Sequence, residues 1–267
     1  MAYVEVDDGV ELYYKAEGEG KPVIFIHGVW MSSRFFHKQM AYFKEGYRAI
    51  TLDLRGHGNS SKVQSGHTVA QYAQDVKVFM EKLELQDVTL IGWSMGAFVI
   101  WEYLHQFGED NIKASVIVDE LASDFKWDDF DIGAFDLATL TSMMRDIQTD
   151  QSQLLEGFLP LMFKEDLSKE ELRWMLRETM KVPASIASAI LFDQSIIDCR
   201  PYFSSITLPT LLCFGRAEKL IPVAAGEHLH KEIPYSRLEV FEDSCHCPFL
   251  EEPERFNMVV DRYLQSL

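Results

Sequence analysis

One stretch of the sequence indicates the fold most clearly: Val88-Thr89-Leu90-Ile91-Gly92-Trp93-Ser94-Met95-Gly96. Its first four residues form a short apolar run, which is typical of a strand buried on both faces of a sheet. Beyond it, Phe98, Trp101 and Leu104 recur at helical spacing. A G-x-S-x-G pattern between a strand and a helix predicts a sharp turn that lifts the serine hydroxyl above the sheet; a purely structural turn is the alternative. We therefore expect Ser94 to be a catalytic nucleophile.

Similar apolar runs occur elsewhere in the first 120 residues, with helical patterns between them. Thr68 and Gln71, for example, form a capping-box pattern that predicts the start of a helix. Alternation of strands and helices predicts a parallel sheet in an α/β fold. Ala2–Asp7 and Val10–Ala16 alternate in polarity and are joined at Asp8-Gly9, which predicts a hairpin. The other predicted strands here are Val23–Ile26, Tyr47–Leu52 and Ala114–Val118.

Strand patterns disappear between residues 121 and 200. Ser168 and Glu171 form a second capping-box pattern, so we expect this segment to be helical. Strand patterns resume at Thr210–Phe214 and Arg237–Phe241, and a final amphipathic helix has Pro253 near its start. The sequence therefore predicts an α/β core formed by residues 1–120 and 201–267, covered by a helical cap formed by residues 121–200.

A serine nucleophile needs a base, which is usually a histidine held by a carboxylate. His246 follows the last predicted strand, and loops at the carboxyl ends of parallel strands share one edge of the sheet. We expect His246 to be the base, with an ordinary loop histidine as the alternative. For the carboxylate, Glu218 follows the strand Thr210–Phe214 and Asp119 follows the strand Ala114–Val118. Either residue fits the role, and each has a solvated loop carboxylate as its alternative.

Ester hydrolysis also needs hydrogen-bond donors for the oxyanion. We expect one donor to be the backbone N–H of Met95, directly after the nucleophile, and the other that of Val29, in the loop after the strand Val23–Ile26. The predicted cap is rich in aromatic residues and methionine, which suits an adaptable pocket, although packing of the cap onto the sheet explains many of these residues equally well. The expected lining residues are Trp30, Trp93, Phe125, Trp127, Met143, Phe158 and Met162.

Composition excludes several other classes of function. The 267 residues hold 25 Lys and Arg against 42 Asp and Glu, a formal charge of −17. Nucleic acids and anionic membrane surfaces require a basic face, so neither is an expected partner. The four cysteines show no C-x-x-C spacing, and we expect no metal and no cofactor. Without a signal-peptide pattern or a long apolar run, the expected setting is the cytoplasm. The expected partner is a small-molecule ester, bound by a monomer or a small homo-oligomer.

In chain order, these motifs resemble the α/β-hydrolase superfamily over nearly the whole sequence. The resemblance rests on His27-Gly28, Asp53-Leu54-Arg55-Gly56-His57-Gly58, the G-x-S-x-G pattern, Gly215 to Pro222, and His246 followed by Pro248. Within this superfamily, the sequence is most similar to small esterases that are named non-haem chloroperoxidases or bromoperoxidases. It implies a mostly parallel, eight-stranded sheet with flanking helices. It also implies ester hydrolysis without haem or metal, with perhydrolysis to a peracid as a side reaction.

The resemblance bears on the acid as well. The family usually has Asp where this chain has Glu218, and some members take their acid from the strand that here ends at Asp119. The expected activity is that of a carboxylic ester hydrolase acting on small to medium acyl groups through an acyl-enzyme. A lactonase or a carbon–carbon bond hydrolase would use the same residues. A hydrolase-fold signalling protein with little turnover is a further alternative by analogy of fold.

Overall fold

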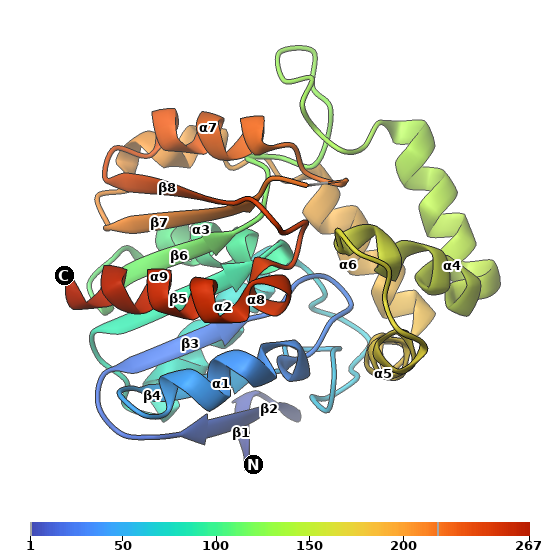
Figure 1. The fold of residues 1–267 in the computed structure, drawn as a ribbon. Coiled ribbons are helices and arrows are strands. Elements are labelled where there is room, and N and C mark those ends of the chain that lie inside the picture. The colour runs from blue at the N-terminus through green and yellow to red at the C-terminus, as the bar shows by residue number, and fades with distance from the viewer. Residues whose placement is uncertain (1, 218) are drawn as a thin grey trace.

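The computed structural model describes residues 2–217 and 219–267. In the described chain, one eight-stranded sheet forms the centre of the molecule, with its strands in the order β1-β2-β4-β3-β5-β6-β7-β8 (Figure 1). The α/β-hydrolase arrangement predicted from the sequence is therefore confirmed. The strands are β1 (Ala2–Asp7), β2 (Val10–Glu17), β3 (Pro22–Ile26), β4 (Arg48–Leu52), β5 (Val88–Trp93), β6 (Ile112–Val118), β7 (Thr210–Gly215) and β8 (Ser236–Phe241).

The sheet is mixed, because its first two strands form an antiparallel hairpin and β2 also pairs antiparallel with β4. Gly9, with φ at +69°, turns this hairpin as the Asp8-Gly9 pattern predicts. Strands β3 to β8 are all parallel to their neighbours. Since parallel strands end at the same edge, the loops after β3, β5, β6, β7 and β8 meet there, and this carboxyl edge contains the candidate site.

Helices cover both faces of the sheet (Figure 1). The central strands alternate their side chains between two buried clusters: Ile24 and Ile26 belong to one, Val23 and Phe25 to the other. Helices α2, α3 and α7 pack on the first cluster, and α1, α8 and α9 on the second. Their bounds are α1 (His37–Phe43), α2 (Val69–Lys82), α3 (Met95–Phe107), α7 (Val223–Glu232), α8 (Pro248–Glu251) and α9 (Pro253–Gln265), with short 3₁₀ turns η1 (Ser33–Phe36) and η3 (Arg200–Ser205).

The two predicted capping boxes differ in the structure. Ser168 and Glu171 bond reciprocally and begin α5, as expected. Thr68 accepts a hydrogen bond from the backbone N–H of Gln71 and begins α2, but the Gln71 side chain donates to Asp75 instead of returning to the cap. Only half of the Thr68 capping box therefore forms, because Asp75 offers a carboxylate one turn along the same helix.

Between β6 and β7, the chain leaves the sheet and forms helices that lie beyond its carboxyl edge (Figure 1). We call residues 121–200 the inserted segment. Strong packing joins its first and last helices, which bury Leu140, Ile147, Ile190 and Leu191. The inserted segment therefore covers the carboxyl edge of the sheet (Figure 1). Its elements are α4 (Leu137–Phe158), the 3₁₀ turn η2 (Leu159–Met162), α5 (Lys169–Thr179) and α6 (Ala184–Ile196).

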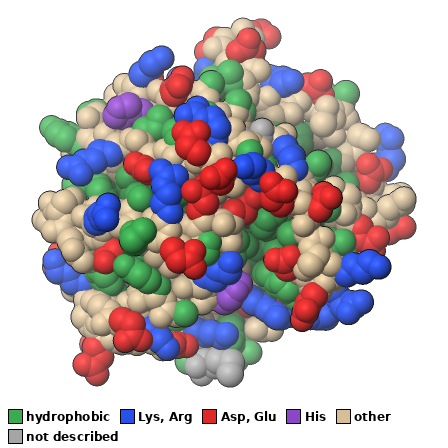
Figure 2. Space-filling view, viewed as in Figure 1, with side chains coloured by type: hydrophobic (Ala, Val, Ile, Leu, Met, Phe, Trp, Pro, Cys, Tyr) green, Lys and Arg blue, Asp and Glu red, His purple; other side chains and the backbone are tan. Residues whose placement is uncertain are grey.

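The surface of this face is mixed, with hydrophobic side chains between charged ones (Figure 2). Figure 2 shows Lys and Arg side chains interspersed with Asp and Glu over the sheet-covering helices and the inserted segment. The negative net charge of the sequence is thus spread over this face and is not gathered on one element. Among residues 2–217 and 219–267, no helix has the length and apolarity that crossing a bilayer requires.

Candidate active site

Ser94 stands in a strained backbone turn between β5 and α3. Its φ of 53° and ψ of −128° are unfavourable for any residue with a side chain. The flanking glycines explain how the turn closes: a Cβ on Gly92 would lie 2.4 Å from the carbonyl oxygen of Gly96, and one on Gly96 would lie 2.3 Å from that of Ile26. The G-x-S-x-G pattern is therefore a steric requirement of this turn. It places the serine at the N-terminus of α3, where the helix dipole favours negative charge.

His246 lies in the loop between β8 and α8, and its backbone is held from two sides. Its N–H donates to the carbonyl of Met162 at 3.1 Å. Its carbonyl accepts a hydrogen bond from the indole N–H of Trp93 at 2.9 Å. The imidazole itself is almost fully buried, with its ring 5.7 Å from that of Trp93. Both the inserted segment and the residue before the nucleophile therefore fix the position of this histidine.

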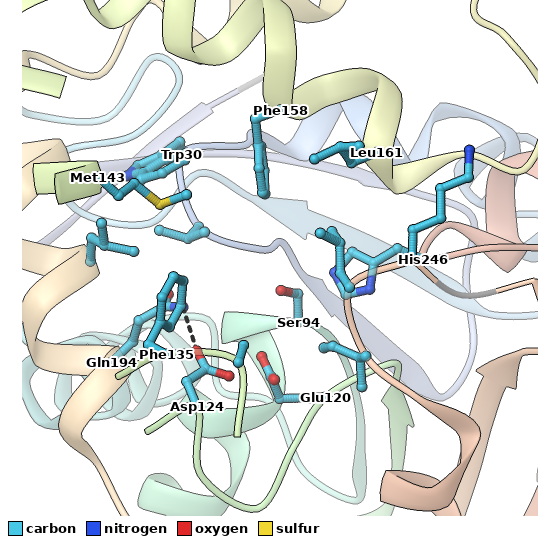
Figure 3. Close-up of a pocket in the computed structure, with 16 residues that line it drawn as sticks. Trp30, Ser94, Glu120, Asp124, Phe135, Met143, Phe158, Leu161, Gln194 and His246 are labelled. Carbon is cyan, nitrogen blue, oxygen red and sulfur yellow. Dashed lines mark hydrogen bonds between the residues drawn. The ribbon is translucent and has the colours of Figure 1, made fainter. Parts of the chain in front are cut away.

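Ser94 and His246 line one cavity of about 270 Å³ at the carboxyl edge of the sheet. Figure 3 shows the serine hydroxyl and the imidazole facing this cavity from neighbouring loops, with Trp30, Phe158 and Leu161 on the opposite side. The structure thus brings together the predicted nucleophile and the predicted base, which are 152 positions apart in the sequence (246 − 94). Enclosure by mostly apolar walls strengthens electrostatic interactions inside the cavity.

The predicted oxyanion donors border the same cavity. Val29 is one of its lining residues, and Met95 is the first residue of α3. Within residues 2–217 and 219–267, neither backbone N–H donates to a protein acceptor. Gly28 permits the close approach, because a Cβ there would lie 3.1 Å from the Cβ of Ser94. Both N–H groups therefore remain as donors beside the nucleophile.

Buried hydrogen bonds hold the Val29 loop in place. The His27 ring is fully buried; its Nδ1 bonds the carbonyl of Gly28 at 2.8 Å, and its Nε2 accepts the N–H of Leu54 at 3.0 Å. Desolvation lowers the pKa of His27, which keeps the ring neutral and suits this donor–acceptor pattern. Trp30, in the left-handed region with φ at 64°, donates from its indole to the carbonyl of Ala187 in α6 at 3.0 Å. The loop is thus tied to both the core and the inserted segment.

Of the two acid candidates, Asp119 lies within the described chain and Glu218 lies outside the described residues. Asp119 directly follows β6 with φ at 47° and is fully buried. Its Oδ2 accepts the backbone N–H of Gly215 at 2.9 Å, and its own N–H donates to the carbonyl of Cys213 at 3.0 Å. This carboxylate is therefore fixed between the ends of β6 and β7, at the same sheet edge as the nucleophile.

Three of the predicted pocket residues line the cavity: Trp30, Met143 and Phe158. The indole of Trp30 meets the Phe158 ring edge-on at 5.5 Å, which forms an aromatic wall opposite Ser94. Further apolar residues from the inserted segment and from the loop after β7 complete the lining. These are Ala134, Phe135, Leu161, Leu191, Leu220 and Ile221, with Lys219 beside them.

The prediction that Trp93 and Met162 line the pocket is wrong. Trp93 points to the other face of the sheet, because the side chains of β5 alternate; there it packs against Phe35 and Phe249. Met162 is buried in the same cluster and faces the site only with its carbonyl, which binds His246. Both residues support the histidine loop from outside the cavity.

Phe125 and Trp127 also lie away from the cavity lining, contrary to the prediction. They belong to a short excursion after β6 in which Trp127 pairs with Phe130. Trp127 is 36% exposed and donates from its indole to the hydroxyl of Ser123 at 2.9 Å. Their aromatic character therefore packs this excursion, with the two rings 5.1 Å apart.

Sequence reasoning missed three further polar residues that line the cavity, Glu120, Asp124 and Gln194. All three side chains are buried. Desolvation and the neighbouring Asp124 raise the pKa of Glu120 well above its ordinary value, and desolvation raises the pKa of Asp124 to about 6. The acidic pair Asp119-Glu120 was visible in the sequence, but the contact of Asp124 with Gln194 in α6 was not.

Comparison with known proteins agrees with this geometry. The model of the alpha/beta hydrolase fold family matches residues 21–253, and the chain belongs to that family. A putative non-heme chloroperoxidase from Synechocystis is 26% identical to it over 99% of this chain and 100% of that protein.

Solved structures show the same likeness. An esterase from Exiguobacterium antarcticum matches with a TM-score of 0.94 and 28% identity, covering 98% of each chain. A bromoperoxidase from Bacillus anthracis matches with a TM-score of 0.94 and 27% identity, covering 99% of each chain. The α/β-hydrolase fold thus extends over essentially the whole described molecule, and its relatives include proteins named esterases and haloperoxidases.

Proposed function

We propose that the protein is a serine hydrolase that cleaves carboxylic esters through an acyl-enzyme. The observation that carries this proposal is the position of Ser94, held at a positive φ on the wall of a largely apolar cavity that His246 shares. A strained, partly exposed serine beside a histidine has little structural value, since its backbone energy must be offset elsewhere. The same arrangement is what a nucleophile needs.

In this proposal, His246 removes the hydroxyl proton of Ser94 as the oxygen attacks the acyl carbonyl. The N–H groups of Val29 and Met95 bind the oxyanion that forms. His246 then delivers the proton to the leaving alcohol, and an acyl group remains on Ser94. Water, deprotonated by His246, attacks this acyl-enzyme and releases the acid.

A carboxylate orients His246 and stabilises its cation in this scheme. Asp119 and Glu218 are the two candidates. Asp119 is supported by its burial and by its fixed position at the end of β6. Glu218 is supported by its place in the sequence after β7. The two variants compared in the Discussion assign the role.

The size of the cavity bears on the substrate. A volume of about 270 Å³ lies just below the range of small-molecule pockets, roughly 300–1,000 Å³. The aromatic wall of Trp30 and Phe158 suits an apolar chain. We therefore propose esters of small to medium acyl groups as substrates, in keeping with the esterase among the similar structures.

Turnover of p-nitrophenyl esters from acetate to octanoate tests the proposal. The wild type is compared with Ser94→Ala and with the control Ser195→Ala. The control removes a buried hydroxyl that has no hydrogen-bond partner in the described chain. We expect wild-type turnover with an optimum at short or medium chains, loss of about 10³-fold or more in Ser94→Ala, and little change in Ser195→Ala. Equal turnover in all three proteins would contradict the proposal.

A further inference from the structure

Apart from Ser94, His246 and Lys219, the polar residues that line the cavity are gathered at one corner. We call Glu120, Asp124 and Gln194 the polar corner. Their side chains are only 1%, 4% and 3% exposed, yet all three border the cavity. Figure 3 shows them on the side of Ser94 opposite Trp30, with Gln194 reaching from α6 toward the loop after β6. Polar groups buried this deeply are costly unless each has a partner.

Most atoms of the polar corner do have partners. The Gln194 amide donates from Nε2 to Asp124 Oδ2 at 2.9 Å. Glu120 Oε1 accepts the backbone N–H of Leu121 at 2.7 Å, and the carboxyl groups of Glu120 and Asp124 are hydrogen-bonded to each other. Desolvation raises the pKa of both carboxyl groups, and the hydrogen bond between them raises that of Glu120 further while lowering that of Asp124, which favours a proton on Glu120. The corner then carries one negative charge, on Asp124, already bound by two donors.

One acceptor in the corner remains without a partner. Gln194 Oε1 is buried and accepts no hydrogen bond from any part of the described chain. Leaving a buried acceptor unsatisfied costs roughly 1–3 kcal/mol. Phe135 and Leu191 line the same cavity, and their apolar side chains supply no donor. A donor that enters the cavity as part of a ligand would satisfy this oxygen.

We propose that the polar corner binds a hydroxyl group on the non-reacting part of the substrate, so that the preferred esters are hydroxy esters. This inference rests on the proposed ester hydrolysis at Ser94. The hydroxyl donates to Gln194 Oε1, and Asp124 holds the Gln194 amide through its Nε2 group, which leaves Oε1 as the unpaired acceptor. Polar groups placed this way in an otherwise apolar pocket fix orientation and give specificity.

The charges around the corner favour a hydroxyl over an ammonium group. The single negative charge on Asp124 is already bound by Glu120 and Gln194. An ammonium group would enter an apolar cavity at a high desolvation cost. It would also lie close to His246, which interacts electrostatically with Asp124 and must become cationic during the reaction. A hydroxyl group avoids both penalties.

Matched ester pairs test this proposal, with acid release followed by titration at constant pH. In each pair a hydroxyl replaces a methyl group of similar size. The pairs are ethyl 3-hydroxybutanoate with ethyl 3-methylbutanoate, ethyl 6-hydroxyhexanoate with ethyl heptanoate, and 3-hydroxypropyl butanoate with butyl butanoate; ethyl 6-aminohexanoate is the cationic probe. We expect kcat/KM to favour the hydroxy ester in at least one pair by about 10-fold or more, and the amine to be the poorer substrate.

Two variants in α6 separate recognition from cavity shape. Gln194→Leu removes the acceptor. In the pair that shows the preference, it should bring the ratio of kcat/KM for the hydroxy ester to that for the methyl-bearing ester to about one. Leu191→Ala lies one turn earlier on the same cavity wall and removes only apolar volume, so it should leave the preference in place. Gln194→Met repeats the test with a flexible side chain of similar length. The proposal would be overturned by kcat/KM ratios near one for every pair in the wild type. It would also be overturned if both Gln194 variants kept the wild-type kcat/KM ratio.

The outcome also separates this inference from the proposed function. Ser94-dependent cleavage of the methyl-bearing esters without any preference for hydroxyl would overturn the polar-corner proposal and leave ester hydrolysis standing. If no ester is cleaved, the proposed function fails. Calorimetric binding of each uncleaved pair to Ser94→Ala then decides the inference. Tighter binding of one hydroxy ester by about 10-fold supports the subsite, whereas equal binding, or binding of neither, overturns it.

Discussion

The indole N–H of Trp93 donates to the backbone carbonyl of His246 at 2.9 Å, so the residue preceding the nucleophile holds the loop that carries the proposed base. Ser94 follows the carboxyl end of β5 and His246 follows that of β8, and this bond joins the two loops directly. The side chain of Trp93 is directed away from the cavity, yet it acts on the geometry inside it.

Trp93→Phe should lower kcat/KM for p-nitrophenyl esters by about 5- to 10-fold. Phenylalanine keeps most of the packing but loses the bond to His246, a contribution of about 1 kcal/mol. Trp101→Phe is the matched control, because Trp101 is equally buried and packs on Phe203 far from the site. Similar activity losses in the two variants, measured at equal folded fractions, would show that the bond to His246 has no special role.

Asp119→Asn and Glu218→Gln should differ sharply in activity. The variant that removes the orienting carboxylate should lose about 10⁴-fold in kcat, because the imidazole then takes the wrong tautomer. The other should lose less than about 10-fold, and each variant serves as the control for its partner. Initial rates with one ester settle the assignment. Small, equal losses would mean that neither carboxylate orients His246.

Gly96→Ala should abolish activity and destabilise the fold. Its Cβ would lie 2.3 Å from the carbonyl oxygen of Ile26, so β3 and the turn at Ser94 would have to separate. Gly157→Ala is the control, since a Cβ there meets nothing within 4 Å and the position lies within α4. That control should gain about 0.5–1 kcal/mol of stability from helix propensity. Thermal unfolding and ester turnover measure both effects, and an active, stable Gly96→Ala protein would refute this account of the turn.

Asp124 should make the protein less stable as the pH rises. Burial raises the pKa of Asp124 from 3.8 to about 6, so between these values the folded chain binds a proton that the unfolded chain has released. The stability associated with that proton is present below about pH 4 and is lost as the pH rises through about 6, a change of about 3 kcal/mol.

Urea unfolding of the wild type and Asp124→Asn at pH 4 and pH 7 measures this effect. The free energy of unfolding of the wild type, relative to the variant, should fall by about 3 kcal/mol from the lower to the higher pH. Asp128→Asn, an exposed substitution in the same segment, should show no such change. A constant difference between wild type and Asp124→Asn would contradict the assigned shift.

The sequence predicts the fold well because its local signals agree with one another. The apolar runs Val23–Ile26 and Val88–Ile91 allow only strands covered on both faces, and the glycines around Ser94 allow only a sharp turn. The positions of Ser94 and His246 on one cavity follow from parallel strands ending at one edge. These features depend on spacing and residue size, which are visible in the sequence.

The cavity wall was harder to predict, because it depends on how the inserted segment packs. Residue type alone suggested Phe125 and Trp127, but the chain after β6 folds back on itself and keeps both out of the cavity. The polar corner brings Glu120 and Asp124 to Gln194, about 70 positions further on. No local pattern marks such a long-range contact, and a glutamine within a helix ordinarily indicates a solvated face.

In the proposed reaction, Ser94 becomes acylated during ester cleavage. Rapid acid quenching of the protein with p-nitrophenyl butanoate, followed by intact-mass measurement and peptide mapping, tests it most directly. We predict one added butanoyl group, located on the peptide that contains Ser94, and its absence from Ser94→Ala. Ester turnover without an adduct on that peptide would contradict this mechanism, and so would undiminished ester turnover by Ser94→Ala.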